Sequence, residues 1–466
     1  MSLPPDQRTV AVILAAGLGT RMRSRTPKVL HTICGRPMLA YVIEAAHRAT
    51  GVKPMVVYSP ATAALCDAFA EAATFALQPE PQGTARALAV GVEALPDTVH
   101  EVVVLSGDVP LVDPELVAEL AEARREAGAV MALVSVDTLE PEGLGRVVRD
   151  DEDRVLRIVE EKDATESERA IDEINAGVYA FDMAWLRNRL SDVEPSPMTG
   201  EYYLPALVEM ARADGHPVVA LQVDDDGTLQ GINDRHQLAL VEADMVMQIL
   251  TRHRLAGVSI PWSEATVIDA DVELAEDVTI EPGVVLRGAS KIGRDTVIGA
   301  ASRIEDSIIG ERCVIYTSVI ESSVVEDDVR IGPFAHLRPG SHIGKGAEIG
   351  NFAEVKKSRL GPGTKQHHFS YIGDADVGAR VNIGAGTITA NYDGTMKYPT
   401  VIGDDAFIGS DTILRAPVTV GEGSVTGAGS VVTKDVPPGM LAVGVPARIR
   451  ERRPKHPGAE PEATSD

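Results

Sequence analysis

The stretch that decides the fold is residues 268–304, IDADVELAEDVTIEPGVVLRGASKIGRDTVIGAASRI. It carries an aliphatic residue at every sixth position: Ile268, Leu274, Ile280, Leu286, Ile292, Ile298 and Ile304. An α-helix repeats every 3.6 residues and a strand every two, so neither explains this spacing. Short strands that turn a corner every six residues do explain it, because three of them close a triangular coil around the aliphatic side chain. The period is the signature of a parallel β-helix of hexapeptide repeats.

The same period returns twice further along the chain. It recurs at Val325, Ile331, Leu337, Ile343, Ile349 and Val355, and again at Ile402, Ile408, Leu414 and Val420. A narrow prism filled with aliphatic side chains also accounts for the composition, in which aromatic residues make up only 4% and 42 of 466 residues are glycine. We expect the β-helix to span residues 258–453, with the polar, proline-rich residues 454–466 as a disordered tail.

The preceding part of the chain follows a different pattern. Buried strands are predicted at residues 10–17, 54–59 and 101–108, and amphipathic helices at 37–49, 84–95 and 114–128. This alternation predicts an α/β domain over residues 1–232, with a mostly parallel, Rossmann-like sheet, helices on both faces and ligands at the carboxyl ends of its strands. A linker helix is expected within residues 233–257, from about Arg235 to Leu255.

Charge and cysteine content exclude several classes of protein. The chain has 44 basic and 69 acidic residues, a net charge of −25, which disfavours nucleic acid and anionic membrane surfaces as partners. Cys34, Cys66 and Cys313 are widely spaced and odd in number, so neither a disulfide framework nor a zinc site is indicated. The first apolar run is too short for a signal peptide or a membrane span, so we expect a cytoplasmic protein.

A glycine-rich run, LAAGLGTRM (residues 14–22), directly follows the first predicted strand. Gly17 and Gly19 would let the backbone approach a phosphate closely, and Arg21 and Lys28 would add positive charge. The run resembles the signature of sugar-1-phosphate nucleotidylyltransferases. In that family the reaction is attack by a sugar 1-phosphate on the α-phosphorus of a nucleoside triphosphate, and pyrophosphate leaves.

The resemblance implies a set of residues that bind the nucleotide and its sugar. Asp108 and Asn233 match the family's Mg²⁺ ligands, and such oxygen ligands suit Mg²⁺. Ser106 stands where the family commonly has tyrosine, from which we expect little change. The positions implied for UTP and UDP-N-acetylglucosamine are Leu14, Ala15, Ala16, Gly17, Arg21, Lys28, Gln78, Gly83, Thr84, Ser106, Gly107, Asp108, Gly145, Glu160, Asn175 and Asn233.

The hexapeptide period lapses between about Val355 and Ile402, and unusual polar residues gather there, including His367 and His368. With this segment the whole chain resembles the bacterial bifunctional enzymes that join N-acetylglucosamine-1-phosphate uridyltransferase to glucosamine-1-phosphate N-acetyltransferase. The resemblance implies a left-handed β-helix and aligns the family's catalytic base with His368. Neutral histidine suits that role. Glu354 is either its partner or simply a solvated glutamate.

The same resemblance implies the remaining sites of the β-helix. Gly444 departs from a basic residue present in some relatives, and Arg448 is a candidate substitute. The sugar-phosphate positions are Arg338, Lys356, Tyr371 and Asn382, and the acetyl-CoA positions are Ala385, Asn391, Tyr392, Ser410, Ala428 and Gly444. The family also implies a homotrimer, with acetyl-CoA bound between neighbouring prisms.

The function expected from the resemblance is two-step synthesis of UDP-N-acetylglucosamine, a cell-wall precursor. Acetyl-CoA would acetylate glucosamine 1-phosphate, and a Mg²⁺-dependent uridylyl transfer from UTP to N-acetylglucosamine 1-phosphate would follow. Two alternatives are a nucleotidylyltransferase with a regulatory β-helix, and a β-helix that serves only as an oligomerisation scaffold. Both predict ordinary repeats throughout and leave the irregular segment that contains His367 and Tyr392 unexplained.

Overall fold

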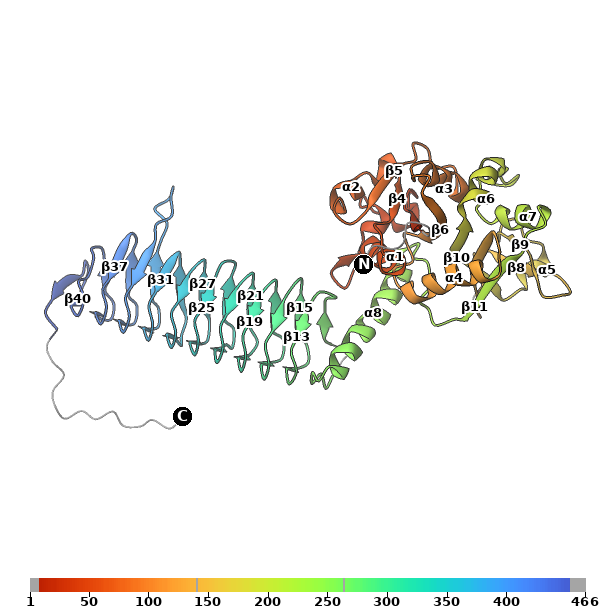
Figure 1. The fold of residues 1–466 in the computed structure, drawn as a ribbon. Helices are drawn as coiled ribbons and strands as arrows, with labels where there is room; N and C mark the ends of the chain where they lie inside the picture. The colour runs from red at the N-terminus through yellow and green to blue at the C-terminus, as the bar shows by residue number, and fades with distance from the viewer. Residues whose placement is uncertain (1–7, 140, 263–264, 453–466) are drawn as a thin grey trace. The chain divides into compact units, whose positions relative to one another are not determined.

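The computed structural model describes residues 8–139, 141–262 and 265–452 (Figure 1). The contacts between residues divide the chain into a first unit that ends at Asp244 and a second unit that begins at Met245. The predicted linker helix is α8 (Arg235–Leu255), which starts in the first unit and ends in the second. The predicted disordered tail, residues 454–466, lies outside the described residues.

The first unit is built on one twisted sheet. Its strands lie in the order β11-β7-β10-β6-β1-β4-β5, and a β8–β9 hairpin is attached to β10. The strands are β1 (Arg8–Leu14), β4 (Met55–Tyr58), β5 (Thr74–Leu77), β6 (Val99–Ser106), β7 (Met131–Asp137), β8 (Arg146–Arg149), β9 (Val155–Val159), β10 (Glu173–Asp182) and β11 (Val218–Asp224). A separate small hairpin joins β2 (Thr32–Ile33) to β3 (Arg36–Pro37).

Helices cover both faces of this sheet, as predicted (Figure 1). α1 packs against β1 and α4, while α3 packs against β1, β4 and β5. The helices are α1 (Met38–Thr50), α2 (Ala64–Ala68), α3 (Thr84–Glu93), α4 (Pro114–Glu126), α5 (Glu166–Arg169), α6 (Met183–Arg189) and α7 (Ala206–Ala213), with short 3-10 turns η1 (Thr20–Met22), η2 (Lys28–Leu30), η3 (Pro60–Thr62) and η4 (Leu190–Asp192).

The sheet is mixed in direction. β1 pairs in parallel with β4 and β6, but β10 runs antiparallel between β6 and β7. The reason is the connection from β7 to β10, which contains the β8–β9 hairpin and only the one-turn helix α5 instead of a crossover helix. Parallel strands need such a crossover, so the chain returns in the opposite direction.

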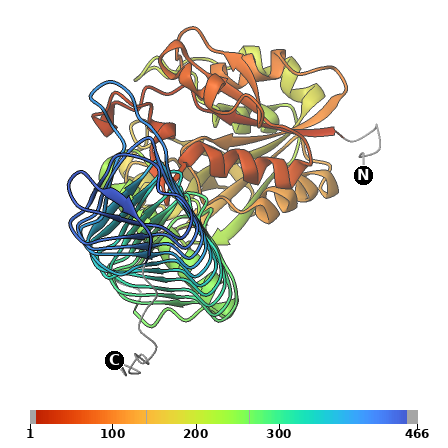
Figure 2. The same cartoon turned by 90° about the vertical axis from the view of Figure 1, so that its left-hand side faces the viewer.

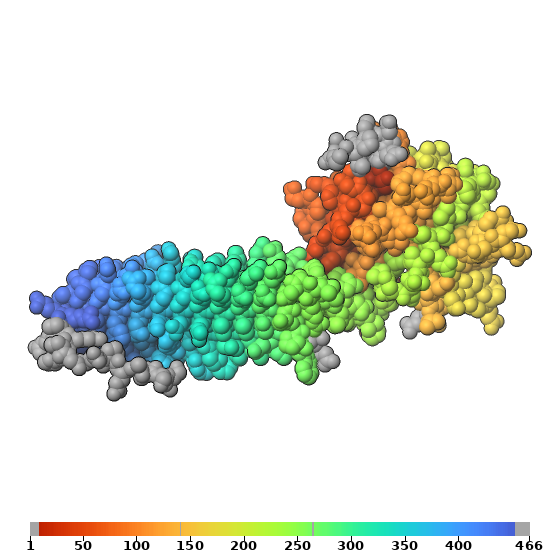
Figure 3. All heavy atoms as spheres, turned by 60° about the horizontal axis from the view of Figure 1, so that its bottom comes forward, coloured from red at the N-terminus to blue at the C-terminus, as the bar shows by residue number. Residues whose placement is uncertain are grey.

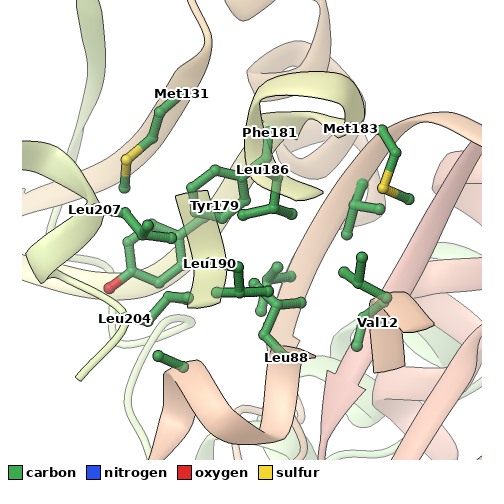
Figure 4. Close-up of a cluster of buried hydrophobic side chains, with 14 of the residues drawn as sticks. Val12, Leu88, Met131, Tyr179, Phe181, Met183, Leu186, Leu190, Leu204 and Leu207 are labelled. Atoms are coloured by element: carbon green, nitrogen blue, oxygen red, sulfur yellow. The ribbon is translucent and has the colours of Figure 1, made fainter. Parts of the chain in front are cut away.

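A continuous apolar core joins the sheet to α3, α6 and α7. Figure 4 shows Val12 of β1 and Leu88 of α3 beside Leu186, Leu190 and Leu207. Tyr179 and Phe181 of β10 belong to the same cluster, and their rings stack with centroids 5.9 Å apart. Burial on this face therefore fixes the register of β10 against its neighbours.

The second unit is a three-sided prism of short parallel strands (Figure 2). The first face contains β12 (Val267–Ile268), β15 (Val285–Arg287), β18 (Arg303–Glu305), β21 (Val319–Glu321), β24 (His336–Arg338), β27 (Ala353–Lys356), β30 (Ser370–Gly373), β33 (Ile388–Ala390), β36 (Ile413–Arg415) and β39 (Val431–Val432). The second face contains β13 (Glu273–Leu274), β16 (Lys291–Ile292), β19 (Ile308–Ile309), β22 (Val324–Val325), β25 (His342–Ile343), β28 (Arg359–Leu360), β31 (Ala375–Val377), β34 (Thr400–Ile402) and β37 (Val418–Val420).

The third face completes each coil. It contains β14 (Thr279–Ile280), β17 (Val297–Ile298), β20 (Val314–Ile315), β23 (Arg330–Ile331), β26 (Glu348–Ile349), β29 (Lys365–Gln366), β32 (Asn382–Ile383), β35 (Phe407–Ile408), β38 (Val425–Thr426), β40 (Leu441–Val443) and β41 (Arg448–Arg450). β41 pairs antiparallel with β40. Figure 3 shows the prism, green to blue, as a continuous rod.

The aliphatic residues of the six-residue period point into the prism. All of those predicted above are buried except Leu274, which is half-buried in the β13 coil. Successive coils stack them in register, as where Ile331 pairs with Ile349. This arrangement confirms the predicted fold class for the second unit.

The six-residue period lapses between Val355 and Ile402 in the sequence, but the stack of coils is not interrupted there in the structure. The coils continue without a break, and Leu360, Gln366, Ile372, Val377, Ile383 and Thr389 fill the inward positions. The period fails because two coils shorten by one residue, two inward residues are polar, and residues 391–399 leave the prism as a loop. Figure 1 shows this loop projecting beyond the others.

Among the described residues, no helix combines the length and the apolar character that crossing a membrane requires.

Val324 and Val325 of β22 provide a test of the prism core. Val325 is 1% exposed and Val324 is 37% exposed, although the two are adjacent. We expect Val325→Ala to destabilise the second unit by about 2 kcal/mol or more, through lost burial and a residual cavity. Val324→Ala should change stability by less than about 0.5 kcal/mol. Urea unfolding of both variants measures the difference, and equal effects would contradict the inward assignment.

Candidate active sites

The first candidate site lies where the parallel strands of the first unit end. The amide of Ala15, just after β1, donates to Val57 O of β4 at 2.9 Å, and the amide of Gly107, after β6, donates to Leu14 O at 3.0 Å. These bonds bring the loops after β1, β4 and β6 to one edge of the sheet. The predicted residues Leu14, Ala15, Gly107 and their neighbours therefore share that edge.

The glycine-rich loop after β1 has the open backbone that an anion needs. Gly19 adopts φ +59°, and a Cβ there would come within 2.6 Å of Lys28 Cβ. A Cβ on Gly17, by contrast, would meet no atom within 4 Å, so space is open beside it. Gly19 lets the loop fold onto Lys28, while Gly17 faces room for a ligand.

Four predicted residues form one polar cluster. Lys28 Nζ makes an ion pair with Asp108 Oδ2 and donates to Asn233 Oδ1 at 3.3 Å. Arg21 donates to the same Asn233 oxygen at 2.7 Å. The amide of Ile232 donates to Asp108 O at 2.9 Å, which clips the segment before α8 to the end of β6. Residues more than 200 positions apart in sequence thus meet at one point.

A residue that sequence reasoning missed supports Asn233. The side-chain Oε1 of Gln237, in the first turn of α8, accepts from the Asn233 amide at 2.7 Å. The Asp234 carboxylate accepts from the amides of His236 and Gln237 and so caps the helix, and these backbone hydrogen bonds lower the pKa of Asp234. The N-terminus of α8 therefore fixes the backbone of Asn233.

The donor set at this cluster suits Mg²⁺. Asp108 Oδ2 and Asn233 Oδ1 already converge on a cation, the Lys28 ammonium, and both are the oxygen ligands that Mg²⁺ prefers. Within the described ranges no group of three His, Cys, Asp or Glu side chains could hold a metal. A two-oxygen set is sufficient for Mg²⁺, since this ion usually keeps several waters and binds substrate phosphates as well.

A cavity of about 780 Å³ opens beside this cluster. Its lining includes Ser106 and Asp108 at the end of β6, Asn175 and Gly177 of β10, and Asn233. Because β10 runs antiparallel, the start of that strand lies at the same edge as the end of β6. The reversal of β10 therefore supplies the wall of the cavity.

Asn175 lines this cavity, Gly145 lies next to Asn175, and Glu160 lies next to Gly145. The Asn175 amide donates to Gly145 O at 2.8 Å, and a Cβ on Gly145 would lie 3.5 Å from Glu160 Oε1. The side chain of Asn175 donates to Tyr179 Oη at 2.6 Å. Burial raises the pKa of the Glu160 carboxyl, and the nearby Asp163 and Glu201 raise it further.

Gln78, Gly83 and Thr84 belong to the segment that runs from the end of β5 to the first residue of α3. Gln78 follows β5, is 3% exposed, and its Nε2 has no hydrogen-bond partner among the described residues. Gly83 precedes α3 with φ +110°, where a Cβ would come within 2.5 Å of Tyr202 O. Thr84 Oγ1 accepts from the Leu204 amide at 2.9 Å, so residues 202–204 brace this loop.

The order of the strands arranges these groups in a line. Gln78 follows the edge strand β5, Gly83 and Thr84 begin α3 above β1, β4 and β5, the glycine-rich loop follows the central β1, and Asn175 lies beyond β6 on β10. One edge of the sheet thus offers a buried amide, then an open loop with two cations, then a polar cavity. That sequence of environments matches a base, a phosphate chain and a sugar.

The second candidate site lies at the corner between the third and first faces of the prism, which we call the His368 corner. His367 and His368 follow β29, and their rings meet edge to face with centroids 6.5 Å apart. His367 Nε2 contacts Glu348 Oε2 at 2.9 Å, whereas Ser370 Oγ donates to the backbone carbonyl of His368 at 2.9 Å. The two adjacent histidines therefore have different environments.

A cationic cluster lies on the first face, at the ends of β24 and β27 that lead toward the second face. Arg338 and Lys356 are register partners, and Arg338 donates to Glu354 Oε1 at 2.9 Å. Glu354 thus pairs with Arg338, and Tyr371 is its register partner on the next coil. Lys397, which the sequence analysis missed, lies near Lys356, and this second ammonium lowers the pKa of Lys356. The grouped charges suit a phosphate.

The remaining predicted residues lie at two corners of the prism: Asn382 and Ala385 near the His368 corner, and Asn391 and Tyr392 at the corner between the first and second faces. Asn382 lies on the third face, where Lys365 is its register partner, so the corner separates it from Arg338 and Lys356. Asn391 donates to Asp374 Oδ2 at 2.5 Å, while Tyr392 is 59% exposed at the base of the projecting loop. The positions that follow third-face strands in successive coils are Ala385, Ser410, Ala428 and Gly444.

These small residues form a column along the His368 corner. The Asp411 amide donates to Ala385 O at 2.6 Å and the Gly429 amide donates to Ser410 O at 2.8 Å, which shows that the coils stack at these positions. Ser410 and Ala428 are exposed. Small exposed side chains leave room for an extended ligand along the prism.

The fold and the two sites define a nucleotidyltransferase unit followed by a hexapeptide-repeat transferase unit. The profile of the MobA-like NTP transferase domain matches residues 11–178, and that of the bacterial transferase hexapeptide (six repeats) matches residues 322–357 and 399–434. Curated relatives named "Bifunctional protein GlmU" match nearly the whole chain. The one from Mycobacterium bovis BCG is 41% identical and covers 99% of this chain and 95% of its own length.

Two further relatives with the same name come from other bacteria. The one from Heliobacterium modesticaldum is 43% identical over 94% of this chain and 95% of its own length. The one from Caldanaerobacter subterraneus is 42% identical, with 96% of both chains covered. The chain belongs to the GlmU family of bifunctional proteins, and it is a bifunctional nucleotidyltransferase and acyltransferase. This confirms the family resemblance and excludes a β-helix without a ligand of its own.

The Glu160 carboxyl provides a test of the first site. Its folded-state pKa is raised, so the unfolded chain ionises first as the pH rises, and ionisation destabilises the folded state. Glu160→Gln should therefore raise the melting temperature at pH 7.5. The gain should vanish below about pH 4.3, the ordinary glutamate pKa, where both states are protonated.

Thermal unfolding between pH 4 and pH 8 measures this effect. Glu119→Gln, at an exposed position of α4, is the control and should show no such pH-dependent gain. A Glu160→Gln variant that is less stable at pH 7.5 than at pH 4, relative to the parent chain, would contradict the assignment.

Proposed function

We propose that the chain synthesises UDP-N-acetylglucosamine in two reactions, one in each unit. The second unit would transfer acetyl from acetyl-CoA to glucosamine 1-phosphate, and the first would transfer uridylyl from UTP to the product. Membership of a family of bifunctional proteins over nearly the whole chain supports the pair of activities. We also propose a cytoplasmic location, supported by Cys66 and Cys313, which form no disulfide among the described residues.

In uridylyl transfer, a phosphate oxygen of N-acetylglucosamine 1-phosphate would attack the α-phosphorus of UTP. One P–O bond forms, the bond to the β-phosphate breaks, and pyrophosphate leaves. Arg21, Lys28 and the amides of the loop from Leu14 to Gly19 would hold the phosphates in line. The unpartnered, buried amide of Gln78 would bind the uracil, and Gly145, Glu160 and Asn175 would bind the sugar.

Asp108 and Asn233 would hold Mg²⁺ in this reaction. When bound, the ion neutralises charge on the phosphate oxygens as it develops. The Lys28 ammonium, which these two oxygens now share, would then be available to the phosphate chain.

In acetyl transfer, the 2-amine of glucosamine 1-phosphate would attack the thioester carbonyl of acetyl-CoA. A C–N bond forms, the C–S bond breaks, and the amine proton passes to His368 and then to the departing thiolate. His368 suits this role because a neutral imidazole nitrogen can accept the proton of the attacking amine. Arg338, Lys356, Tyr371 and Asn382 would bind the sugar phosphate.

Acetyl-CoA would lie along the column of small residues at the His368 corner. Ala385, Ser410, Ala428 and Gly444 leave the corner open in successive coils, whereas Asn391 and Tyr392 lie at the next corner, between the first and second faces. The observation that carries the acetyltransferase proposal is this alignment, because the column leads to the corner that holds His368. Arg448 lies on the terminal strand β41. It is the register partner of Val443, the residue before Gly444.

Substitutions at the two sites should separate the activities. With glucosamine 1-phosphate and acetyl-CoA, His368→Ala should reduce thiol release by at least about a hundredfold, because the general base is lost. It should leave pyrophosphate release from UTP and N-acetylglucosamine 1-phosphate unchanged. Asp108→Asn should do the reverse, and both rates are measured on the full chain.

His367 offers a matched control for His368. It is the adjacent histidine, equally exposed, and its ring is paired with Glu348. His367→Ala should retain acetyl transfer within about threefold. Loss of thiol release in the His367 variant and retention in the His368 variant would move the base assignment to His367.

We further propose a homotrimer, in which the His368 corner contacts a neighbouring copy. The support is a row of exposed aromatic side chains on this edge of the prism: Tyr316, Phe334, Phe352 and Phe369, which are 45%, 54%, 63% and 58% exposed. Phe334 and Phe352 stack, with ring centroids 5.2 Å apart. Exposed apolar rows of this kind mark interaction surfaces.

Phe352→Asp should dissociate this assembly. Phe352 has φ +57°, a conformation that aspartate tolerates, so the prism should still fold. Light scattering after size exclusion should give about three times the 49.4 kDa chain mass for the parent and the single-chain mass for the variant. Phe352→Leu keeps an apolar corner and should remain trimeric. A parent chain of monomeric mass would refute the proposal.

A further inference from the structure

A buried amide interrupts the apolar column of the third face at one coil. The inward positions of that face are isoleucines in the five coils before it and the two after it: Ile280, Ile298, Ile315, Ile331, Ile349, Ile383 and Ile408. Gln366 takes the intervening position in register with Ile349 and is 0% exposed. Burial of an amide among aliphatic side chains disfavours folding unless its polar atoms are paired.

Only one end of this amide is paired. Gln366 Nε2 donates to Ser370 Oγ at 2.9 Å, whereas Gln366 Oε1 has no hydrogen-bond partner among the described residues. Ser370 Oγ in turn donates to the carbonyl of His368 at 2.9 Å. Since the serine oxygen accepts from Gln366, its single hydrogen is directed at His368.

The amide and the serine occur together at one corner. In the two preceding coils of the same length, the inward residue is Ile331 or Ile349, and the residue four positions later is Ala335 or Ala353. In the coil that carries His368, both positions become polar, Gln366 and Ser370. Hydroxyl residues also occupy the serine position in other coils, where Ser318 Oγ donates to Tyr316 O at 2.6 Å, so it is the buried amide of Gln366 that sets the His368 coil apart.

The hydrogen bonds from Gln366 through Ser370 to His368 complete the support of the backbone at the His368 corner. The Asn351 amide donates to His367 O at 3.2 Å, and the Gly386 amide donates to Phe369 O at 2.7 Å. Neighbouring coils thus hold the carbonyls on both sides of His368, and the Ser370 hydroxyl holds the one between them. The backbone that carries the imidazole is then fixed at three consecutive peptide groups.

We infer that Gln366 is a positioning residue for acetyl transfer, acting through Ser370 on the backbone of His368. This rests on the proposed role of His368 as general base. A base must hold its nitrogen within hydrogen-bond reach of the amine it deprotonates, so a small displacement of the ring lowers the rate without weakening substrate binding. The unpaired oxygen of the buried amide is the stability cost of this arrangement.

Gln366→Leu tests the inference, because leucine has a similar size and suits an apolar column. We expect kcat for acetyl transfer to fall about tenfold, with KM for both substrates within about twofold. The melting temperature of the full chain should stay the same or rise, since an unpaired polar atom is removed. Ile349→Leu, one coil earlier in the same column, controls for repacking and should leave kcat unchanged.

Ser370 variants show whether the effect passes through the hydroxyl. Ser370→Ala should lower kcat as much as Gln366→Leu, and the double variant should be no slower than either single one. Ser370→Thr, which keeps the hydroxyl, should restore near-parental kcat, as Thr387 already occupies the equivalent position of the next coil.

The outcomes separate this inference from the proposed function. If His368→Ala keeps thiol release, the base assignment itself is wrong. If His368→Ala is inactive while Gln366→Leu and Ser370→Ala both keep parental kcat, the positioning role is wrong and the base assignment stands. Additive losses in the double variant would also overturn the route through Ser370.

Discussion

The second unit depends on one constraint: backbone hydrogen bonds run along the prism, so every residue has its partners one coil away. Ile331 is in register with Ile349 on the third face, and Leu337 with Val355 on the first. The interior is therefore only wide enough for an aliphatic column, and charged groups must lie on faces or corners. This is why the proposed acetyltransferase residues, from Arg338 to Ala428, lie on the faces and corners of the prism.

In the first unit the corresponding constraint is the direction of the strands. Parallel β1, β4 and β6 bring three loops to one edge, and the reversed β10 adds its first residues to the same edge. Asn175 would lie at the opposite end of the sheet if β10 ran parallel to β6. The cavity that contains Asn175, Asp108 and Asn233 thus exists because the connection before β10 lacks a crossover helix.

Local patterns predicted most of the fold. The six-residue period predicted the inward ladder, and the run after β1 predicted a glycine-rich loop with an open backbone, because both depend on residues close together in sequence. The direction of β10 was not predictable from periodicity, which is the same for either direction. The coils between Val355 and Ile402 were not predictable either. The period reports only apolar side chains, and the inward residues Gln366 and Thr389 are polar.

The candidate sites were predicted unevenly. Family resemblance indicated Asp108 and Asn233, but their shared contact with Lys28 joins residues that are distant in sequence and carry no common signal. Glu354 was weighed as a partner of His368, and the structure pairs it with Arg338 because the two lie on adjacent coils. Lys397 lies in a loop without periodicity, so no pattern in the sequence indicated it.

The projecting loop at residues 391–399 shows how such a protein acquires new recognition surfaces. β33 before the loop pairs with β36, and β34 after it pairs with β31, so the ladder on either side is undisturbed. A closed barrel or a layered sheet would have to re-register several strands to accept seven or eight extra residues at one turn. In a stack of coils each layer is complete in itself, and the corner becomes a place where length can vary while the scaffold is inherited unchanged.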